Sequence, residues 1–527
     1  MTLAIKTGAP ADDVSEGLPE GWTLTTLGDA CEINPPKAPK DSLPADAPVT
    51  FVPMPAVDAD EGAITKPQIK GFSEVRKGFT SFRENDVIMA KITPCMENGK
   101  AAIARNLING QGFGSTEFHV FRTTGAVLPE FIYHFIRQNV YRRAAEAEMT
   151  GSVGQKRVPQ SFLEATALPL PPLTEQVEII RSLTELLSSV KASRAKLRRV
   201  PKILKRLRQA VLAAACSGRL TEDWRAEHPT IESGHKLAER IRQSHVAQGL
   251  GHGGQAAAPT EDVHNVTQDE IPEAWAVEEL KVLCQPGRSI TYGILKPGPD
   301  VSGGVPYIRV ADFPNNRLKL EGIRRTTKQI ADMYRRSSLR EGDLLLSIRG
   351  TAGRVCRVPA QLDGANITQD TARISVHPEL SSDYMEFYLQ SPSAQKRLEA
   401  AMKGVAVRGV NIGDVRVLQV ALPPRIEQDE IVLRVDVMLK IVEAIAQRLQ
   451  KATAQADKLA QAILAKAFRG ELVSTEAELA RREGRDYEPA SVLLERIKAA
   501  KTALDSGKAL RSKRLAPRSG KRRTVSA

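Results

Sequence analysis

Cysteine and long apolar runs are scarce in this chain, and each scarcity excludes a class of protein. The five cysteines in 527 residues are odd in number and widely scattered, which excludes a disulfide framework and favours reduced thiols. No stretch approaches the ~18 consecutive apolar residues of a membrane helix, and no charged-then-apolar export signal opens the sequence. We therefore expect a cytoplasmic protein, and its length predicts more than one domain.

Signatures of catalysis are missing as well. The eight histidines form no HExxH motif, and the Gly-Lys pairs lack the upstream glycine of a phosphate-binding loop. NPPK at 34–37 has Lys37 where a motif of adenine methyltransferases places an aromatic ring that stacks on a flipped base, so we interpret it as a turn. The sequence predicts no catalytic residue, no metal site and no cofactor in this chain.

What the chain does contain is a second copy of its own pattern. From Leu170 to Gly218 the sequence aligns without a gap onto Leu422 to Gly470, 252 residues later, and 18 of the 49 positions are identical. The segments before the two helices are related too. PEGW at 19–22 corresponds to PEAW at 272–275, and FRENDVIMAKI at 82–92 resembles LREGDLLLSIRG at 339–350. Duplication on this scale indicates one structural unit used twice, not a solenoid of short repeats.

Each LPP motif is followed by apolar residues at alternating steps of four and three, which is the seam pattern of a coiled coil. Equal length and register favour packing of the two helices on each other in antiparallel orientation, and Pro201 predicts a kink in the first helix. Packing of each helix on a globular body alone is the alternative. The predicted seam consists of Ile179, Leu183, Leu186, Val190, Leu197, Leu204, Leu207, Val211, Ile431, Val435, Met438, Val442, Ile445, Leu449, Leu459 and Ile463.

The segments before the two helices consist of short β-branched runs punctuated by glycine, aspartate and asparagine, each followed by a helix at 128–147 or 382–402. They predict two similar α+β domains of ~150 residues, each large enough to bury its own core. We expect Trp22 and Trp275 to belong to those cores.

The formal net charge of +13 is unevenly spread. Residues 508–527 carry eight Lys or Arg and no acid, which is typical of a solvated, disordered tail. Residues 191–208 carry nine Lys or Arg and no acid, so part of the first helix has a basic face that could follow a phosphate backbone or an acidic partner. A solvated helix surface is the alternative for this basic face.

The chain contains two modules, and each module ends in an LPPxxEQ motif, a long helix and an AxxGxL terminus. This arrangement resembles the specificity subunit of type I restriction–modification systems. The residues that carry the resemblance are LPPLTEQ and LPPRIEQ, the helix ends AVLAAACSGRL and AILAKAFRGEL, and the openings PEGW and PEAW. The resemblance covers residues 18–220 and 271–472. The long connector and the tail depart from the minimal plan of the family.

The resemblance implies an α+β fold with pseudo-twofold internal duplication, in which two long helices form an antiparallel coiled coil that separates two target-recognition domains. The boundaries are 18–169 for the first domain, 170–218 for the first spacer helix, 219–270 for a partly flexible connector, 271–421 for the second domain, 422–470 for the second spacer helix, and 471–527 for a helical segment and basic tail.

The implied role is to read a bipartite site in double-stranded DNA without performing chemistry. Two modification (methyltransferase) subunits would methylate adenine, and restriction (motor-nuclease) subunits would cleave. S-adenosylmethionine, ATP and Mg²⁺ are expected on those partner subunits. A free-standing coiled-coil adapter with two protein-binding modules is the alternative hypothesis, and a fused enzyme that cuts or methylates DNA alone has no supporting motif.

Loops dense in glycine and polar side chains are the candidates for DNA contact. Glycine lets a backbone approach a ligand closely, and arginine can form a bidentate pair with guanine in the major groove. Such loops lie at 91–100, 151–158, 347–354 and 403–411, and tight turns with solvated cations are the alternative at any single position. The predicted DNA-contacting residues are Lys91, Thr93, Asn98, Ser115, Gln155, Lys156, Arg157, Arg349, Thr351, Arg354, Gln369 and Arg408.

Overall fold

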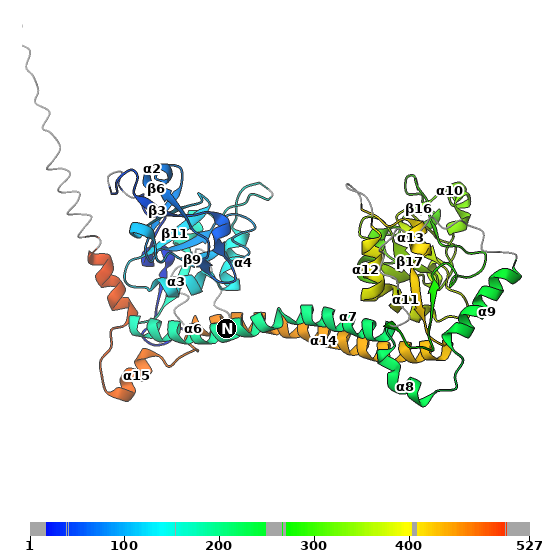
Figure 1. Cartoon of the computed structure of the whole chain (residues 1–527). Coiled ribbons are helices and arrows are strands. Elements are labelled where there is room, and N and C mark those ends of the chain that lie inside the picture. Colours follow the sequence, from blue (N-terminus) through cyan, green and yellow to red (C-terminus); the bar gives the residue numbers. More distant parts are fainter. Residues whose placement is uncertain are drawn as a thin grey trace, which may run out of the picture. The chain divides into compact units, whose positions relative to one another are not determined.

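The computed structural model describes residues 17–37, 39, 42–152, 154–248, 266, 270–402, 408–500 and 502 (Figure 1). The chain divides into two compact units, one made of Met1–Lys196 with Ala452–Ala527 and the other of Leu197–Lys451. Each unit therefore combines an α+β domain from one sequence copy with part of a long helix from the other copy. None of the helices in the described ranges combines the length and apolarity needed to cross a membrane.

The domain of the first unit is built on two four-stranded sheets. The first sheet has the order β6-β3-β10-β7, with β10 parallel to β3, and the second has the order β2-β11-β8-β9, in which neighbouring strands are antiparallel. A two-stranded ribbon, β1-β12, leads into the long helix. The strands of these two sheets and of the ribbon are β1 (Thr23–Thr26), β2 (Cys31–Ile33), β3 (Pro48–Val52), β6 (Gln68–Gly71), β7 (Thr80–Arg83), β8 (Val87–Ala90), β9 (Ala101–Ile103), β10 (Gln111–Gly114), β11 (Phe118–Thr123) and β12 (Ala167–Leu170).

The domain of the second unit repeats this plan. Its four-stranded sheet has the order β14-β20-β17-β18, a second sheet has the order β16-β15-β19 with β15 parallel to β19, and β13 pairs with β21 in the ribbon. The same succession of sheet, sheet and ribbon confirms two similar α+β domains. The strands are β13 (Ala276–Glu279), β14 (Thr291–Tyr292), β15 (Val305–Ile308), β16 (Arg325–Thr326), β17 (Leu344–Ser347), β18 (Val355–Arg357), β19 (Asn366–Ile367), β20 (Thr371–Ile374) and β21 (Gln419–Leu422).

Each single helix predicted after the sheets is in fact two helices. Residues 128–147 form α3 (Pro129–Ile136) and α4 (Asn139–Ala147), and residues 382–402 form α11 (Ser382–Gln390) and α12 (Pro392–Ala400). Ser391 shows the physical reason: its backbone is extended and its side chain accepts the backbone N–H of Ala394, so it caps a new helix that starts at Pro392. The prediction of one continuous helix was therefore wrong in both copies.

Trp22 and Trp275 lie in the cores, as predicted, and each donates its indole N–H to a buried glutamate. Trp22 donates to Glu175 at 2.8 Å, and Trp275 donates to Glu427 at 2.8 Å. These are the glutamates of the two LPPxxEQ motifs. The second glutamate also accepts the Thr221 hydroxyl at 2.8 Å and pairs with the Arg225 guanidinium. The repeated motif thus marks the point where each long helix is fixed to its domain.

The glutamines of the same motifs bind backbone groups inside each domain. Gln176 Oε1 accepts the N–H of Leu128 at 2.9 Å, and Gln428 Oε1 accepts the N–H of Ser381 at 2.9 Å. Both amide side chains are fully buried. Since buried polar groups require partners, the LPPxxEQ sequence is explained by packing and hydrogen bonding.

Replacing Glu427 by alanine should remove the buried carboxylate that accepts from the Arg225 cation and from the Trp275 indole N–H. Removing one member of a buried ion pair typically costs about 3–5 kcal/mol of folding free energy. Glu175→Ala is the matched variant and should cost less, because the donors described on its carboxylate are the neutral N–H groups of Trp22 and Glu476. Calorimetric unfolding of both variants measures the difference. Equal destabilisation would contradict the role assigned to Arg225.

The long helices are α6 (Leu173–Leu197), α7 (Val200–Cys216) and α14 (Arg425–Ala467). The first predicted helix is interrupted between α6 and α7, and Pro201 lies in the first turn of α7, where a proline needs no backbone N–H. The kink predicted from Pro201 is thus an interruption. The second helix is continuous over the matching stretch, where Thr453 takes the place of the proline.

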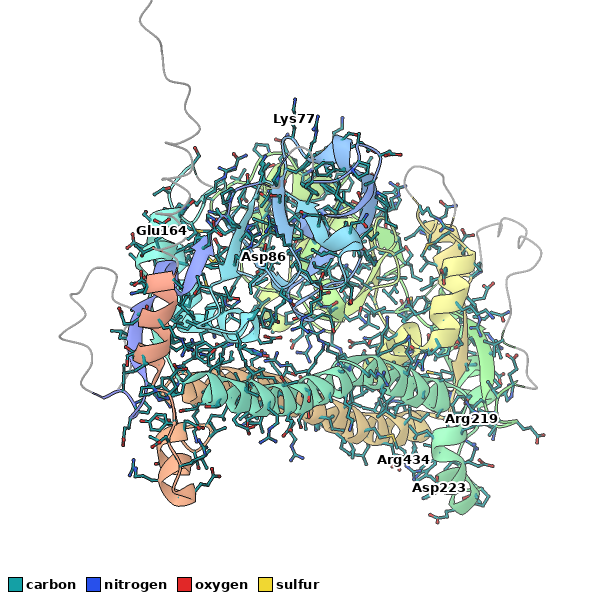
Figure 2. All side chains as sticks on the ribbon, turned by 90° about the vertical axis from the view of Figure 1, so that its left-hand side faces the viewer. Lys77, Asp86, Glu164, Arg219, Asp223 and Arg434 are labelled. Carbon is teal, nitrogen blue, oxygen red and sulfur yellow. The ribbon has the colours of Figure 1, made fainter. Side chains whose placement is uncertain are left out.

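Within each unit the paired helices run antiparallel. In the first unit, Glu175 of α6 accepts the N–H of Glu476, whereas Arg194, nearer the end of α6, pairs with Asp457 of α14 at 2.5 Å. In the second unit, the Leu220 carbonyl, just after α7, accepts Arg434 of α14 at 2.9 Å (Figure 2). Further along the chain, Arg225 pairs with Glu427, nearer the start of α14. Residue numbers rise along one helix and fall along the other in both units, as the seams predicted.

The buried face of these helices differs from the predicted seam at five positions. Ile179, Leu183, Val190, Leu204, Val211, Ile431, Val435 and Ile463 are buried, and Leu197, Val442 and Leu449 are half-buried, but Leu186, Leu207, Met438, Ile445 and Leu459 are more than a third exposed. In two cases the next residue packs on the domain core instead, Leu187 for Leu186 and Leu439 for Met438, and Ala460 is buried next to Leu459. These helix ends pack on a globular domain as well as on a helix, so the buried stripe follows the 3.6-residue period of a single helix.

The segments that follow the long helices pack on the domain of the other sequence copy. In the second unit they form α8 (Glu222–Glu227) and α9 (Gly234–Ala247), and Leu237 and Ile241 of α9 enter the core. In the first unit they form α15 (Glu476–Glu483) and a helix at 490–500, whose Leu494 enters that core. Residues 236–245 of the connector lie within α9. Residues 249–265 of the connector and the basic tail 508–527 lie outside the described residues.

Candidate nucleic-acid interface

In the first domain, the two predicted loops 91–100 and 151–158 and the turn that carries Ser115 meet at one end of the sheet that contains β8 and β11. Lys91, directly after β8, donates its backbone N–H to the carbonyl of Glu117 at 2.9 Å and accepts the N–H of Val158 at 2.9 Å. The N–H of Thr93 donates to the carbonyl of Lys156 at 3.1 Å. One surface, which we name face 1, therefore brings together the predicted residues Lys91, Thr93, Ser115, Gln155, Lys156 and Arg157.

Arg157 is held by a carboxylate that sequence reasoning missed. Its Nη2 and Nε donate to the two oxygens of Glu117 at 2.8 and 2.9 Å, and its Nη1 donates to the Gln155 carbonyl at 3.1 Å. These hydrogen bonds from the guanidinium hold the pKa of Glu117 below its ordinary value. The ion pair is therefore fully formed at neutral pH and is lost as the pH falls through that lowered pKa.

Replacing Glu117 by glutamine should release the Arg157 fork and raise the net charge of face 1 by one. A freed arginine can bind a DNA phosphate, so we expect tighter binding to random-sequence DNA and a log–log salt slope steeper by about 0.9. Titrations of the purified protein at several salt concentrations measure this slope. Glu20→Gln is the control, because it makes the same charge change at a residue that pairs with Arg481. An unchanged slope for Glu117→Gln would show that face 1 does not meet the phosphate backbone.

His119 holds the segment that carries Arg157 in place. Burial lowers its pKa to about 4, so the ring is neutral at physiological pH. Its Nε2–H then donates to the Val158 carbonyl at 2.9 Å, and its Nδ1 accepts the Asn34 amide at 3.0 Å. Asn34 opens the NPPK segment and has a φ of 51°, which supports the interpretation of that segment as a turn.

The remaining candidate of the first domain, Asn98, is exposed on the turn that follows Thr93. The Thr93 hydroxyl donates to Glu97 at 2.9 Å, which ties the turn together beneath this side chain. Ser115 accepts the Glu117 N–H at 3.2 Å and so supports the carboxylate that holds Arg157. These contacts make Thr93 and Ser115 supports of the loop conformation, while Asn98 and Lys156 are exposed.

In the second domain the same backbone frame presents different side chains. Val410 donates its N–H to the Ile348 carbonyl at 2.8 Å, as Val158 does to Lys91, and Ile348 donates to the Asp370 carbonyl at 2.8 Å, as Lys91 does to Glu117. We name this surface face 2. It contains the predicted residues Arg349, Gln369 and Arg408, of which both arginines are exposed. Residues 403–407 of the predicted loop lie outside the described residues.

Gly409 allows the two loops of face 2 to approach. It forms an isolated antiparallel bridge with Arg349, and a Cβ at this position would lie 2.9 Å from both the Ile348 carbonyl oxygen and the Arg349 Cγ. A side chain there would push the loops apart. This glycine therefore places Arg408 beside Arg349.

The Arg349 side chain is positioned by a single amide. Its Nη1 donates to Gln369 Oε1 at 3.4 Å, and Gln369 is fixed by its own N–H, which donates to the Ile294 carbonyl at 3.0 Å. The guanidinium is exposed and pairs with no carboxylate among the described residues, in contrast to Arg157. Such a guanidinium can form a bidentate pair with guanine.

The last two candidates, Thr351 and Arg354, stabilise the turn after β17. The Thr351 carbonyl accepts the Ser347 hydroxyl at 2.6 Å, and the Arg354 N–H donates to the same hydroxyl at 2.8 Å. The Arg354 guanidinium reaches the Val310 carbonyl at 3.3 Å, so it is partly engaged within the domain. DNA contact by these residues stays a prediction.

The basic run at 191–208 forms ion pairs in the first unit and a hydrogen bond to a neutral side chain in the second. Lys191 pairs with Glu61 and Arg194 with Asp457 in the first unit, and Arg208 donates to Gln390 at 2.9 Å in the second. Lys202, Lys205 and Arg206 are exposed. Within the ranges that the structure describes, no group of three His, Cys, Asp or Glu side chains is arranged to hold a metal ion. We therefore assign no metal ligands.

Comparison with known proteins agrees with this duplicated arrangement. The model of the type I restriction modification DNA specificity domain matches residues 19–201 and again residues 272–454. The EcoBI specificity subunit of Escherichia coli is 34% identical over 388 residues, which are 73% of this chain and 74% of that protein. The EcoEI specificity subunit of Escherichia coli is 27% identical over 511 residues, which are 85% of this chain and 82% of that protein.

Two solved structures share the fold. The crystal structure of the HsdS subunit from Thermoanaerobacter tengcongensis has a TM-score of 0.51 at 22% identity and covers 86% of this chain and 98% of that chain. A chain from a study of complex assembly and conformational transition of the type I R-M system has a TM-score of 0.58 at 22% identity, with 86% and 99% coverage.

A duplicated α+β recognition domain with paired long helices defines the class, and the chain belongs to the family of type I restriction modification DNA specificity domains. It is a DNA sequence-recognition (specificity) subunit of a type I restriction–modification complex. The alternative of a free-standing adapter has no support among these relatives.

Proposed function

We propose that face 1 and face 2 each read one part of a bipartite site in double-stranded DNA. One observation carries this assignment: the same backbone frame presents Lys156 and Arg157 in the first domain and Arg408 and Gly409 in the second. Because the backbone hydrogen bonds are the same, both faces can approach the DNA major groove in the same way. The side chains on the two faces differ, so they favour different bases. The two halves of the site should therefore differ in sequence.

The chemistry would belong to partner subunits. Two modification subunits that bind S-adenosylmethionine would methylate adenine in the recognised site, and restriction subunits that use ATP and Mg²⁺ would cleave DNA. The relatives named above are specificity subunits of type I restriction enzymes, which supports this division of labour. This chain would contribute no catalytic residue, only the choice of site.

The paired helices α6, α7 and α14 would fix the gap between the two parts of the site. Antiparallel pairing in each unit and the continuity of α14 over 43 residues support this role. A helix pair resists compression, whereas a flexible linker would permit a range of gaps.

Competition binding tests the proposal that this chain is the DNA reader. The complex of this chain with its modification subunit should bind a duplex carrying its site 10³-fold or more tighter than random DNA, an order of magnitude typical of specific readers. Binding to both DNAs should weaken steeply with added salt. A complex that binds all duplexes with the same affinity, or whose affinity for DNA does not change with salt concentration, would contradict DNA reading by this chain.

A further inference from the structure

An exposed leucine lies beside the predicted base contacts of face 2. Leu295 is 47% exposed, in the segment that follows β14. The preceding residue, Ile294, forms an isolated parallel bridge with Thr368. The next residues of the two strands, Leu295 and Gln369, therefore occupy matching positions, and side chains at matching positions point to the same side. Leu295 is thus in line with the Gln369 amide, whose oxygen accepts a hydrogen bond from the Arg349 guanidinium at 3.4 Å.

The segment that carries Leu295 is fixed by hydrogen bonds and by a close approach of two strands. Ile294 donates its N–H to the Ile367 carbonyl at 2.7 Å, and its own carbonyl accepts the Gln369 N–H at 3.0 Å. A Cβ at Gly293 would overlap the Ile367 carbonyl oxygen, so glycine is what lets the strands pack this closely. The backbone therefore sets the position of Leu295 relative to Gln369 before any ligand binds.

The chain takes a different path at the matching point of the first domain. There β2 occupies the place in its sheet that β14 occupies in the second domain. Asn34, directly after β2, donates its N–H to the Val120 carbonyl at 2.8 Å and has a φ of 51°. Pro35 and Pro36 follow, and neither has an N–H to donate to a neighbouring strand. Among the described residues, the paired segment that carries Leu295 thus belongs to face 2 alone.

An apolar side chain in line with a guanine-reading arginine has one counterpart in the major groove. Of the four bases, only thymine presents a methyl group there, and apolar side chains contact this group. Cytosine presents a donor amine in the same groove, which a leucine cannot satisfy. Two strand spacings of ~4.8 Å separate the backbones of Leu295 and Arg349, which corresponds to about three base pairs at a rise of ~3.4 Å.

We propose that Leu295 is a specificity-determining residue of face 2 that contacts the 5-methyl group of a thymine. This thymine lies in the half of the site that Arg349 reads, within about three base pairs of the guanine that Arg349 contacts. The inference rests on the proposed function, because it requires face 2 to lie in the major groove.

Removing the methyl group from the DNA tests this contact directly. The complex of this chain with its modification subunit is titrated with duplexes in which each thymine of the site is replaced in turn by deoxyuridine, which lacks only the methyl group. At one thymine of the half that Arg349 reads, the replacement should weaken binding about fourfold, as expected for one buried methyl-sized group. Leu295→Ala should weaken binding to the thymine duplex and abolish the response to deoxyuridine at that position.

Two results of these titrations would overturn the proposal. One is a wild-type complex for which no thymine methyl group matters, even if Leu295→Ala weakens binding, because Leu295 would then contact another part of the DNA. The other is a Leu295→Ala complex that remains as sensitive to deoxyuridine as the wild-type complex. Circular dichroism melting checks that the variant is folded.

Leu320→Ala is the matched control. It makes the same substitution at a leucine of the same domain that is 50% exposed, in the segment before β16. This variant should bind both duplexes as the wild-type complex does and should keep the fourfold response. Equal behaviour of the Leu295 and Leu320 variants would show that the effect is not specific to Leu295 and would overturn the assignment.

Sequencing of methylated adenines separates this inference from the proposed function. In cells that carry Leu295→Ala, the preference for thymine should relax at one position in one half of the site, and the other half should stay unchanged. A wild-type motif of two halves that Leu295→Ala leaves unaltered would overturn only the role of Leu295. A wild-type complex that methylates no preferred sequence would overturn the proposed function itself, and this inference with it.

Discussion

Replacing Arg349 by alanine should erase the base preference in one half of the recognised site and leave the other half unchanged. The Arg349 guanidinium is exposed on face 2, and among the described residues its side chain donates to Gln369 alone, so it can form a bidentate pair with a guanine. Loss of such a pair typically costs about 1–3 kcal/mol, or roughly 5- to 150-fold in discrimination at that base pair. Sequencing of methylated adenines in cells that carry the variant complex measures it.

Arg349→Lys separates base reading from charge. Lysine keeps the positive charge but loses the planar fork, so binding should persist while discrimination falls. Gln369→Ala should have a smaller effect in the same direction, because it removes only the group that orients the guanidinium. If Arg349→Ala lowers methylation equally at all sites without changing their sequence, Arg349 contacts a phosphate and not a base.

Lengthening both long helices by one heptad should lengthen the gap in the recognised site by about three base pairs. Seven residues add ~10 Å to a helix, and the rise of DNA is ~3.4 Å per base pair. A heptad nearly preserves the buried face, because seven residues are close to two full turns of a helix. The insertions belong at matched levels, near the break between α6 and α7 and near Ala452 of α14.

The control for this insertion replaces seven residues with the inserted sequence at constant length, which should keep the original gap. Insertion into one helix alone should disrupt the pairing and destabilise the chain. A complex with two lengthened helices that still methylates sites with the original gap would show that the helices do not set the spacing.

Periodicity and repetition were the informative parts of the sequence. The seams predicted an antiparallel helix pair, and within each unit the pairs Arg194–Asp457 and Leu220–Arg434 confirm that direction. The repeated PEGW and PEAW openings predicted buried tryptophans, which Trp22 and Trp275 are. Such features depend on local spacing, so a single sequence contains them.

What the sequence did not reveal depends on contacts between distant residues. Leu459 fits the heptad but is exposed, because the end of α14 packs on a domain whose position no helical period encodes. Glu117 pairs with Arg157 from 40 residues away in the sequence. Because this partner is distant, the sequence alone predicted Arg157 as an arginine available to contact DNA. The splitting of the predicted helix at 382–402 had a local signal, since Ser391 before Pro392 is a capping pair.

The central claim is that this chain reads two blocks of DNA sequence at a fixed separation. The most direct measurement is sequencing of the modified adenines in DNA from cells that express this chain together with its modification subunit. We predict a single motif of two unlike blocks with an invariant gap. Methylation at one uninterrupted block, at blocks with a variable gap, or at no preferred sequence would contradict the claim.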